Sequence, residues 1–219
     1  MAVVGSRVES EANMSKFMLL CAAALACLPA VAGAGVIYKY DDGAADTQAG
    51  LGDNTYLAWM VRYAVEAGGE KINAIEISLP DAIPCEAVLW EDTGGNGNPA
   101  DAQVLFQMPF TGVAGWNTIP VTPSVTVSGS FFVGAYNYGT SGPINVDLSG
   151  YEPHRSWLAS GSSALDLNNL KAAPLKGWFE DWGLEYVAMV RAEATPEPAT
   201  LALLAAGGAM MLLRRRRSR

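Results

Sequence analysis

The sequence contains few of the residues on which enzyme active sites usually depend. It has a single histidine, His154, whereas a metalloenzyme usually draws on several nitrogen ligands. It also lacks the G-x-S-x-G pattern that presents a serine nucleophile in many hydrolases. A secreted hydrolase with paired carboxylates stays open as an alternative, because Asp and Glu are abundant and their separation in space is invisible at this level. We expect a protein that is not an enzyme.

Cationic side chains are scarce in the middle of the chain. Between Gly35 and Thr195 there are 7 Lys and Arg against 19 Asp and Glu. Binding to nucleic acid needs a cluster of cations that displaces the counterions on phosphate, so this composition excludes nucleic acid as a partner. An acidic surface is typical of a soluble secreted protein, and it also suits divalent cations or basic partners.

An N-terminal segment has the layout of a secretory signal peptide. It reads MSKFMLLCAAALACLPAVAGAG from Met14 and combines one lysine, an apolar run too short to span a bilayer comfortably, and small residues spaced for cleavage. Signal peptidase would recognise Ala30 and Ala32, or Ala32 and Ala34. Residues 1–34 are therefore predicted to be an N-terminal extension plus a signal helix, and the mature chain to be exported across the inner membrane.

Removal of that segment leaves Cys85 as the one cysteine of the mature chain. No disulfide can then form within the mature protein. Cys85 lies in the stretch PCEAVLWE, which is typical of a strand, and a lone cysteine in a strand usually behaves as a small buried apolar residue. We expect Cys85 to be buried and not to act as a nucleophile.

The last stretch, TPEPATLALLAAGGAMMLLRRRRSR, has three parts in order. Pro196, Glu197 and Pro198 precede an apolar run, which as a helix would be about 22 Å long against a hydrocarbon core of about 30 Å. The cations that follow would stay on the cytoplasmic side and halt export. These cations are Arg214, Arg215, Arg216 and Arg217. Residues 195–219 are thus predicted to be a sorting segment with a transmembrane-type helix, and a permanent single-pass anchor is the alternative.

This tail resembles the PEP-CTERM sorting signal of Gram-negative bacteria. The resemblance implies that an exosortase, a membrane transpeptidase-like enzyme, cleaves near Pro196-Glu197-Pro198. It further implies a protein that is membrane-anchored before processing and reaches the cell surface or the extracellular matrix after it. Extracellular polysaccharide is the partner to expect in such a matrix.

The middle of the chain has the pattern of short strands. KINAIEISL, from Lys71 to Leu79, alternates apolar and polar residues, and similar runs separated by Gly, Asn and Pro follow along the chain. Residues 35–194 are therefore predicted to form an all-β antiparallel sandwich, with a jelly-roll topology as the first choice. The stretches YDDG, GW and YVAMVRA resemble those of secreted bacterial sandwich domains, which supports the same fold.

Two groups of residues could form a binding site. Trp178, Phe179 and Trp182 lie beside two carboxylates in GWFEDW, a combination that binds sugars when the rings are exposed and fills the end of a core when they are not. Asp92, Asn96 and Asp101 supply oxygen atoms on a glycine-rich loop, as Ca²⁺ requires. The spacing does not match an EF-hand, and the same residue types favour turns, so we expect turn formation and no metal.

The sequence as a whole predicts an exported, non-catalytic protein of the cell surface or extracellular matrix, associated with exopolysaccharide and sorted by an exosortase. A carbohydrate-binding, lectin-like module displayed by the same route is the alternative, and a secreted hydrolase is the third.

Overall fold

The computed structural model describes residues 35–51, 55–137 and 144–195. These residues form strands joined by turns, with three short 3-10 helices. The strands are β1 (Val36–Tyr38), β2 (Thr47–Ala49), β3 (Tyr56–Ala64), β4 (Lys71–Leu79), β5 (Pro84–Glu91), β6 (Gln103–Thr111), β7 (Gly115–Thr126), β8 (Ser130–Asn137), β9 (Ile144–Asp147), β10 (Ser156–Gly161), β11 (Leu175–Trp178), β12 (Val187–Ala188) and β13 (Val190–Ala194). The 3-10 helices are η1 (Pro99–Asp101), η2 (Leu170–Ala172) and η3 (Phe179–Trp182).

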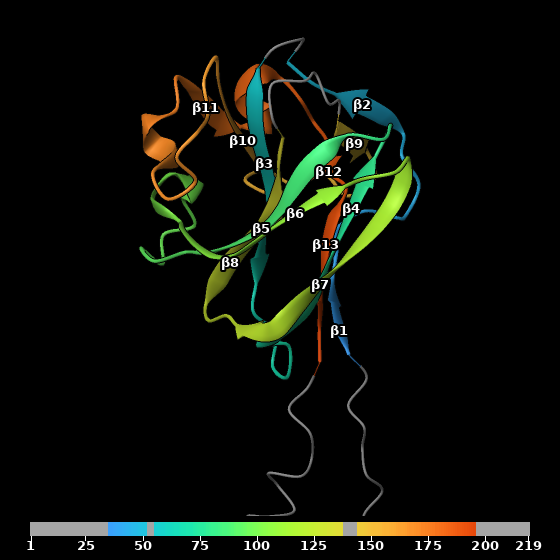
Figure 1. Ribbon diagram of the computed structural model, residues 1–219, viewed down its shortest axis with the longest axis vertical. Coiled ribbons are helices and arrows are strands. Elements are labelled where there is room, and N and C mark those ends of the chain that lie inside the picture. Colours follow the sequence, from blue (N-terminus) through green and yellow to red (C-terminus); the bar gives the residue numbers. More distant parts are fainter. Residues whose placement is uncertain (1–34, 52–54, 138–143, 196–219) are drawn as a thin grey trace, which may run out of the picture. The chain divides into compact units, whose positions relative to one another are not determined.

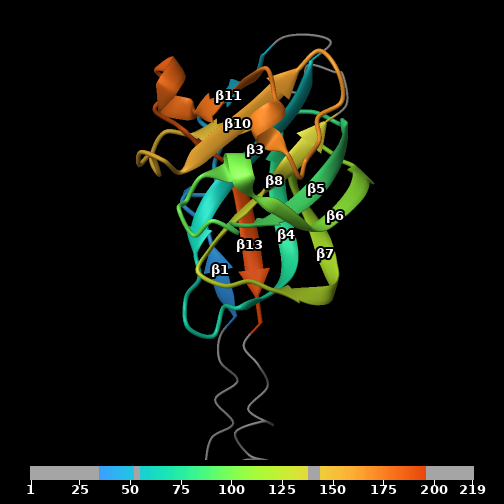
Figure 2. The same cartoon turned by 90° about the vertical axis from the view of Figure 1, so that its left-hand side faces the viewer.

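The strands form two main sheets and one small one (Figures 1 and 2). The order in the six-stranded sheet is β11-β10-β3-β8-β5-β6, and in the four-stranded sheet it is β1-β13-β4-β7. The small sheet has the order β12-β9-β2. Every strand pair is antiparallel. The predicted all-β antiparallel sandwich is confirmed, whereas the predicted signal and sorting helices lie outside the described residues.

Strand β4 shows how the sequence pattern produces the sheet. Ile75, Ile77 and Leu79 are fully buried, as their alternation predicts. Ile77 is opposite Val190 and Ile75 is opposite Ala192 on β13, so buried residues of neighbouring strands coincide on one face. This register places the apolar side of the four-stranded sheet against the core.

The main core lies between the two large sheets. It contains buried aliphatic side chains from both sheets together with aromatic rings. Three of these rings, Tyr38, Tyr63 and Phe131, contact one another. The Tyr38 ring meets the Phe131 ring edge-on with 5.0 Å between centroids. The Tyr63 hydroxyl donates to the carbonyl oxygen of Val190, which joins the six-stranded sheet to the four-stranded one.

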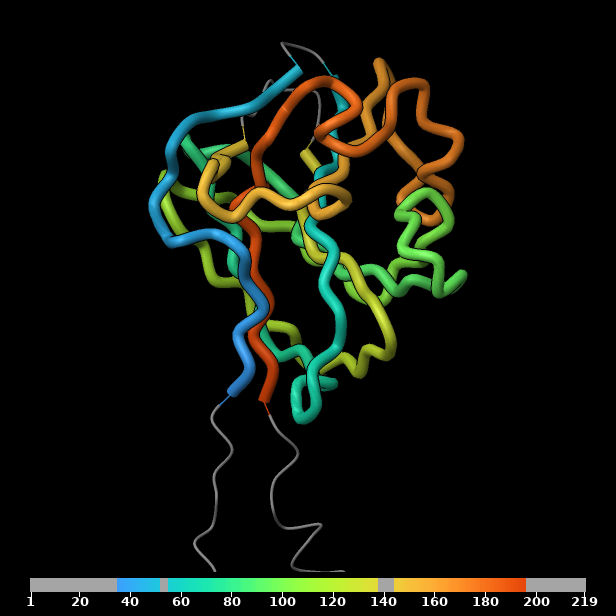
Figure 3. Tube along the Cα trace, turned by 180° about the vertical axis from the view of Figure 1, so that it is seen from behind, coloured from blue at the N-terminus to red at the C-terminus, as the bar shows by residue number. Residues whose placement is uncertain are grey.

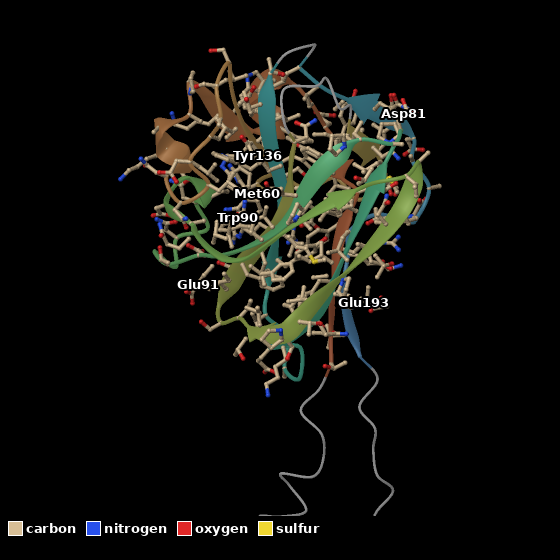
Figure 4. All side chains as sticks on the ribbon, in the orientation of Figure 1. Met60, Asp81, Trp90, Glu91, Tyr136 and Glu193 are labelled. Atoms are coloured by element: carbon tan, nitrogen blue, oxygen red, sulfur yellow. The ribbon has the colours of Figure 1, made fainter. Side chains whose placement is uncertain are left out.

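A second apolar cluster covers the outer face of the six-stranded sheet. Met60 and Trp90 lie in it and are fully buried, with Tyr136 close by (Figure 4). Leu167 and Leu170, from the segment after β10, cover them, and the Trp90 indole N–H donates to the carbonyl oxygen of Leu167 at 3.0 Å. Both faces of this sheet are therefore buried, and for this reason its central strands read as nearly continuous apolar runs rather than as alternating ones.

The first and last strands of the domain are neighbours. Val36 in β1 is opposite Ala194 in β13, and Figure 3 shows the two strands side by side at one end of the domain. The next residue, Thr195, still donates its N–H to the carbonyl oxygen of Lys71 at 3.1 Å. Within residues 35–51, 55–137 and 144–195, no helix has the length and apolar character needed to cross a membrane.

Candidate functional site

The aromatic segment singled out by the sequence forms an edge strand and a short helix. Strand β11 is at the edge of the six-stranded sheet and pairs with β10, with Trp178 opposite Trp157. Helix η3 follows at once, and the Asp181 carboxylate accepts a hydrogen bond from the Trp178 N–H at 2.8 Å. Gly183 ends the helix with φ of 72°, a left-handed conformation that favours glycine.

The three rings of this segment point to different places. Phe179 is fully buried in the main core, so its ring is not available to a ligand at the surface. Trp178 packs against the apolar cluster on the outer face of the six-stranded sheet. Trp182 is 38% exposed and lies over Gly177, where a Cβ atom would be only 3.0 Å from the indole ring.

Gly177 and Trp178 are consecutive in β11, so their side-chain directions point to opposite faces of the strand. Trp182, on the Gly177 side, therefore lies on the opposite face from Trp178. The rings do not form one platform, and Trp182 is the most exposed of the three, whereas Trp178 is half-buried. Leu175 shares the Gly177 face and is 39% exposed, which extends the apolar surface next to Trp182.

His154 lies beside this segment, which sequence reasoning did not foresee. Its backbone N–H donates to a Glu180 carboxylate oxygen at 2.7 Å, and its Nε2 atom is 3.6 Å from the same oxygen. Its ring meets the Trp178 ring edge-on at a centroid distance of 5.2 Å. The backbone of His154 has φ of 60°, a region that histidine tolerates better than most residues. These contacts fix the position of His154 in the loop.

A cavity of about 270 Å³ opens between β1 and the end of β3. Tyr40, Tyr63 and Arg155 line it. The Tyr40 ring stacks on Tyr63 with 4.9 Å between centroids, and the Arg155 guanidinium lies 4.0 Å from the centroid of Tyr40. Both faces of the Tyr40 ring are therefore covered. Burial raises the pKa of Tyr40 above its usual value, which keeps the phenol neutral over the physiological range.

The residues considered for Ca²⁺ lie on the loop between β5 and β6. One Asp92 oxygen accepts from the Gly97 N–H at 2.8 Å, and the Asn98 side chain accepts from the Ala100 N–H at 3.0 Å, so these side chains hold turns. The Asn96 amide donates to an Asp101 oxygen at 3.1 Å. Across the described part of the chain, no three or more His, Cys, Asp or Glu side chains gather closely enough to hold a metal by themselves.

A second set of carboxylates lies at the loops around β2. Asp147 is fully buried and accepts hydrogen bonds from the Asp42 N–H and the Ser149 N–H, both at 2.6 Å. Asp46 accepts from the Leu148 N–H at 2.9 Å. Asp147 was not predicted as a contact residue, because one of its partners, Asp42, is 105 positions away in the chain. These contacts tie two loops together.

Cys85 is buried in the main core, as predicted, and is a free thiol. Burial raises its pKa to about 12. At neutral pH the thiolate is therefore absent, which leaves the side chain unreactive while the domain is folded.

The predicted processing residues cannot be located in the same way. Those of the signal peptide and the sorting tail lie outside the described residues. They are Ala30, Ala32, Ala34, Pro196, Glu197, Pro198, Arg214, Arg215, Arg216 and Arg217.

The described residues thus define an all-β sandwich whose most exposed aromatic feature in the predicted segment is Trp182. No protein-family model and no curated protein matches the sequence significantly. The fold is similar to that of a solved structure described as the cysteine protease and lectin-like domains of Cwp84, a surface layer associated protein of Clostridium difficile, with a TM-score of 0.52 and 12% identity.

That similarity covers 74% of this chain and 36% of the solved chain. A second structure, of the clostridial cysteine protease Cwp84 after propeptide cleavage, matches with a TM-score of 0.51 at 12% identity, over 74% of this chain and 40% of that one. This chain therefore corresponds to well under half the length of either solved chain, and the likeness concerns the fold alone.

Proposed function

We propose that this protein is an exported, non-catalytic component of the cell surface or extracellular matrix, sorted by an exosortase. The observation that carries the proposal is the three-part tail, in which Pro196-Glu197-Pro198, an apolar run and an arginine cluster follow one another. The position of the last described residue also supports the sorting proposal. Thr195, the last described residue, still forms a hydrogen bond to the sheet, and the sorting motif begins at the next position in the sequence.

The beginning of the domain supports the same route. Strand β1 starts at Val36, directly after the candidate cleavage sites at Ala32 and Ala34. Signal peptidase would then remove the leader without removing any residue of the sheet. Since Val36 and Ala194 are paired, both processing events would occur at the same end of the domain and would leave the opposite loops free for partners.

The test compares intact masses of the protein from fractionated cells. We expect the exported form to lack Arg214 to Arg217, and a variant with Ala in place of Pro196, Glu197 and Pro198 to be retained at full length in the inner membrane. A control variant with Ala in place of Thr195 alone should be processed normally. An exported wild-type protein that still carries the arginines would leave a permanent single-pass anchor as the explanation.

We also infer that the topology is a jelly roll. The orders β1-β13-β4-β7 and β3-β8-β5-β6 place successive strands alternately in the two sheets, apart from the β5–β6 hairpin, as two Greek keys wrapped around one core require. Strands β9 to β12 are then an insertion before the last strand, and β11 and η3 belong to that insertion.

A lectin-like module is the second candidate function. Exposed Trp182 over Gly177 favours it, because an indole face open to solvent stacks well on a sugar ring. The lectin-like domain named for the Cwp84 structure also supports it, since we infer that an all-β chain matches that part rather than the protease. A glycan array probed with the wild-type protein and with the Trp182→Ala variant tests this function. Binding that is absent, or that survives the substitution, would speak against it.

A further inference from the structure

The loop between β5 and β6 (residues 92–101, hereafter the Asp92 loop) contains two enclosed carboxylate oxygens that lack a hydrogen-bond donor. Asp92 is only 7% exposed. Its Oδ2 atom accepts from the Gly97 N–H at 2.8 Å and from the Ser130 hydroxyl, but its Oδ1 atom has no partner among the described residues. Asp101 repeats the pattern, because Oδ2 accepts from the Asn96 amide whereas the enclosed Oδ1 has no partner in the described structure.

The two carboxylates lie against the same part of the loop. Asp92 is bonded to Gly97 and Asp101 to Asn96, and these two partners are consecutive in the chain. The Thr93 hydroxyl donates to the Asp101 carbonyl oxygen at 3.0 Å, which closes the loop. A Cβ atom at Gly94 would lie 2.8 Å from Asp101 Oδ2, so the backbone passes unusually close to this carboxylate.

Arg62, a cation that lies against the loop, does not pair with either carboxylate. The Arg62 guanidinium lies against Gly97, where a Cβ atom would be 2.5 Å from Nη1. Yet within the described residues Arg62 forms no ion pair with Asp92 or Asp101. Two enclosed anionic groups thus share one loop without a protein cation to compensate them. A buried carboxylate oxygen that lacks a donor is costly, so a ligand that carries positive charge would relieve it.

We propose that the Asp92 loop binds a calcium ion, with Asp92 and Asp101 as its two carboxylate ligands. Calcium is the appropriate cation because it accepts six to eight oxygen ligands in a flexible geometry, so that backbone carbonyls and water complete the shell. Two carboxylates give a site of modest affinity, with a dissociation constant of about 0.1 to 1 mM, in the range of extracellular modules. The proposal does not depend on exosortase sorting or on glycan binding.

The first experiment measures thermal unfolding of the full chain in chelator and in 10 mM CaCl₂, a probe concentration about ten times the weakest dissociation constant expected for such a site. A ligand that binds only the folded state raises the melting temperature, and we expect a rise of about 3 °C or more. Magnesium at the same concentration is the matched ion control and should have a smaller effect. A melting temperature that does not respond to calcium overturns the proposal.

The second experiment locates the ion. Terbium replaces calcium and emits when nearby tryptophan is excited, and Trp90 precedes the loop by two positions. Asp92→Asn and Asp101→Asn keep an acceptor oxygen for the Gly97 N–H and the Asn96 amide but remove the charge. Each should reduce terbium emission and weaken calcium binding at least tenfold. Asp101→Asn also guards against misfolding, because Asp101 is less buried than Asp92.

Asp81→Asn is the control for loss of one negative charge. Asp81 is exposed and lies on the far side of the domain from Trp90 and Glu91 (Figure 4). The Asp81→Asn variant should bind terbium and calcium as the wild type does. The Arg62→Gln variant should bind both ions at least as tightly as the wild type, because a positive charge near the loop is removed. Equal binding by the Asp92 and Asp101 variants and the wild type, or equal loss in Asp81→Asn, would overturn the assignment. In that case water molecules satisfy the two oxygens.

Discussion

Arg191 forms an ion pair with Asp41 through two of its nitrogen atoms, although the two residues are 150 positions apart. The Nε atom of Arg191 is 3.0 Å and 3.1 Å from the two Asp41 oxygens, and Nη2 also bonds Oδ1. The guanidinium lies 4.0 Å from the centroid of the Trp116 ring as well. Asp41 is 4% exposed, so this pair ties the loop after β1 to the centre of the four-stranded sheet.

Removing the charge of Asp41 should weaken the domain. In Asp41→Asn the Arg191 guanidinium keeps Glu76 at 3.7 Å but loses its closest partner. We expect a loss of about 3 kcal/mol in the free energy of unfolding, the lower end of the range for breaking a buried pair. Urea denaturation measures it. Asp42→Asn is the control, because Asp42 is exposed and an asparagine there can still accept from the Ala44 N–H; equal losses in both variants would contradict the prediction.

The stability of the domain should fall in acid partly because of Asp147. Burial by itself would raise the pKa of Asp147, but hydrogen bonds from Ser149 and Asp42 outweigh it and lower the pKa below its usual value. A carboxyl whose pKa is lowered by folding contributes stability above its unfolded pKa of about 3.9, and the contribution disappears as the pH falls through the folded pKa.

Asp147→Asn should therefore be less stable than the wild type at pH 7, and the difference should shrink toward pH 2. Urea denaturation across this pH range measures the effect, with the exposed Asp81→Asn as a control that should follow the wild type. A difference that is constant with pH would mean that the charge of Asp147 does not contribute.

Phe179 and Trp182 lie in the same short helix, but their substitution should destabilise the domain to very different extents. Phe179→Ala removes a fully buried ring from the main core and should cost about 3 to 5 kcal/mol. Trp182→Ala removes a partly exposed ring and should cost less than about 1 kcal/mol. Thermal and urea unfolding of the two variants give the comparison, and a large loss in Trp182→Ala would mean that the ring is structural.

Gly134, in β8, lies where a side chain would collide with the backbone of the neighbouring strand β3. A Cβ atom there would lie 1.9 Å from the Trp59 carbonyl oxygen and 2.7 Å from the Met60 Cα, so the backbone of β3 would have to move. Gly134→Ala should cost about 3 kcal/mol or more in unfolding free energy. Gly129→Ala is the matched control, because its Cβ would meet nothing within 4 Å and only its positive φ would resist, at about 1 kcal/mol. Equal losses would show that the contact relaxes easily.

Much of the fold could be predicted, because strand periodicity is a local property. The alternation in Lys71–Leu79 gave both the extent of β4 and its buried face. The pattern in Ser130–Asn137 gave a strand but no inner face, since seven of its eight positions are buried. The reason lies elsewhere in the chain, in Leu167 and Leu170, which cover the outer face of that sheet.

The candidate sites were predicted less well for the same physical reason. Spacing within GWFEDW brings three rings together in sequence, but consecutive residues of a strand point to opposite faces, and the main core takes Phe179. His154 joined this segment through Glu180, which is 26 positions away. The Asp92 loop was expected to form turns, and it does. The sequence could not show that folding encloses the Oδ1 atoms of Asp92 and Asp101 without a partner among the described residues.

By itself, the sequence determined the all-β class, the positions of strands such as β4 and β5, the acidity of the domain and the burial of Cys85, because each depends on local pattern or composition. Tertiary structure alone decided which aromatic rings stay at the surface, which carboxylates are tied to distant loops, and that β1 and β13 are partners. These depend on contacts between residues far apart in the chain, and such contacts exist only once the two sheets have packed against each other.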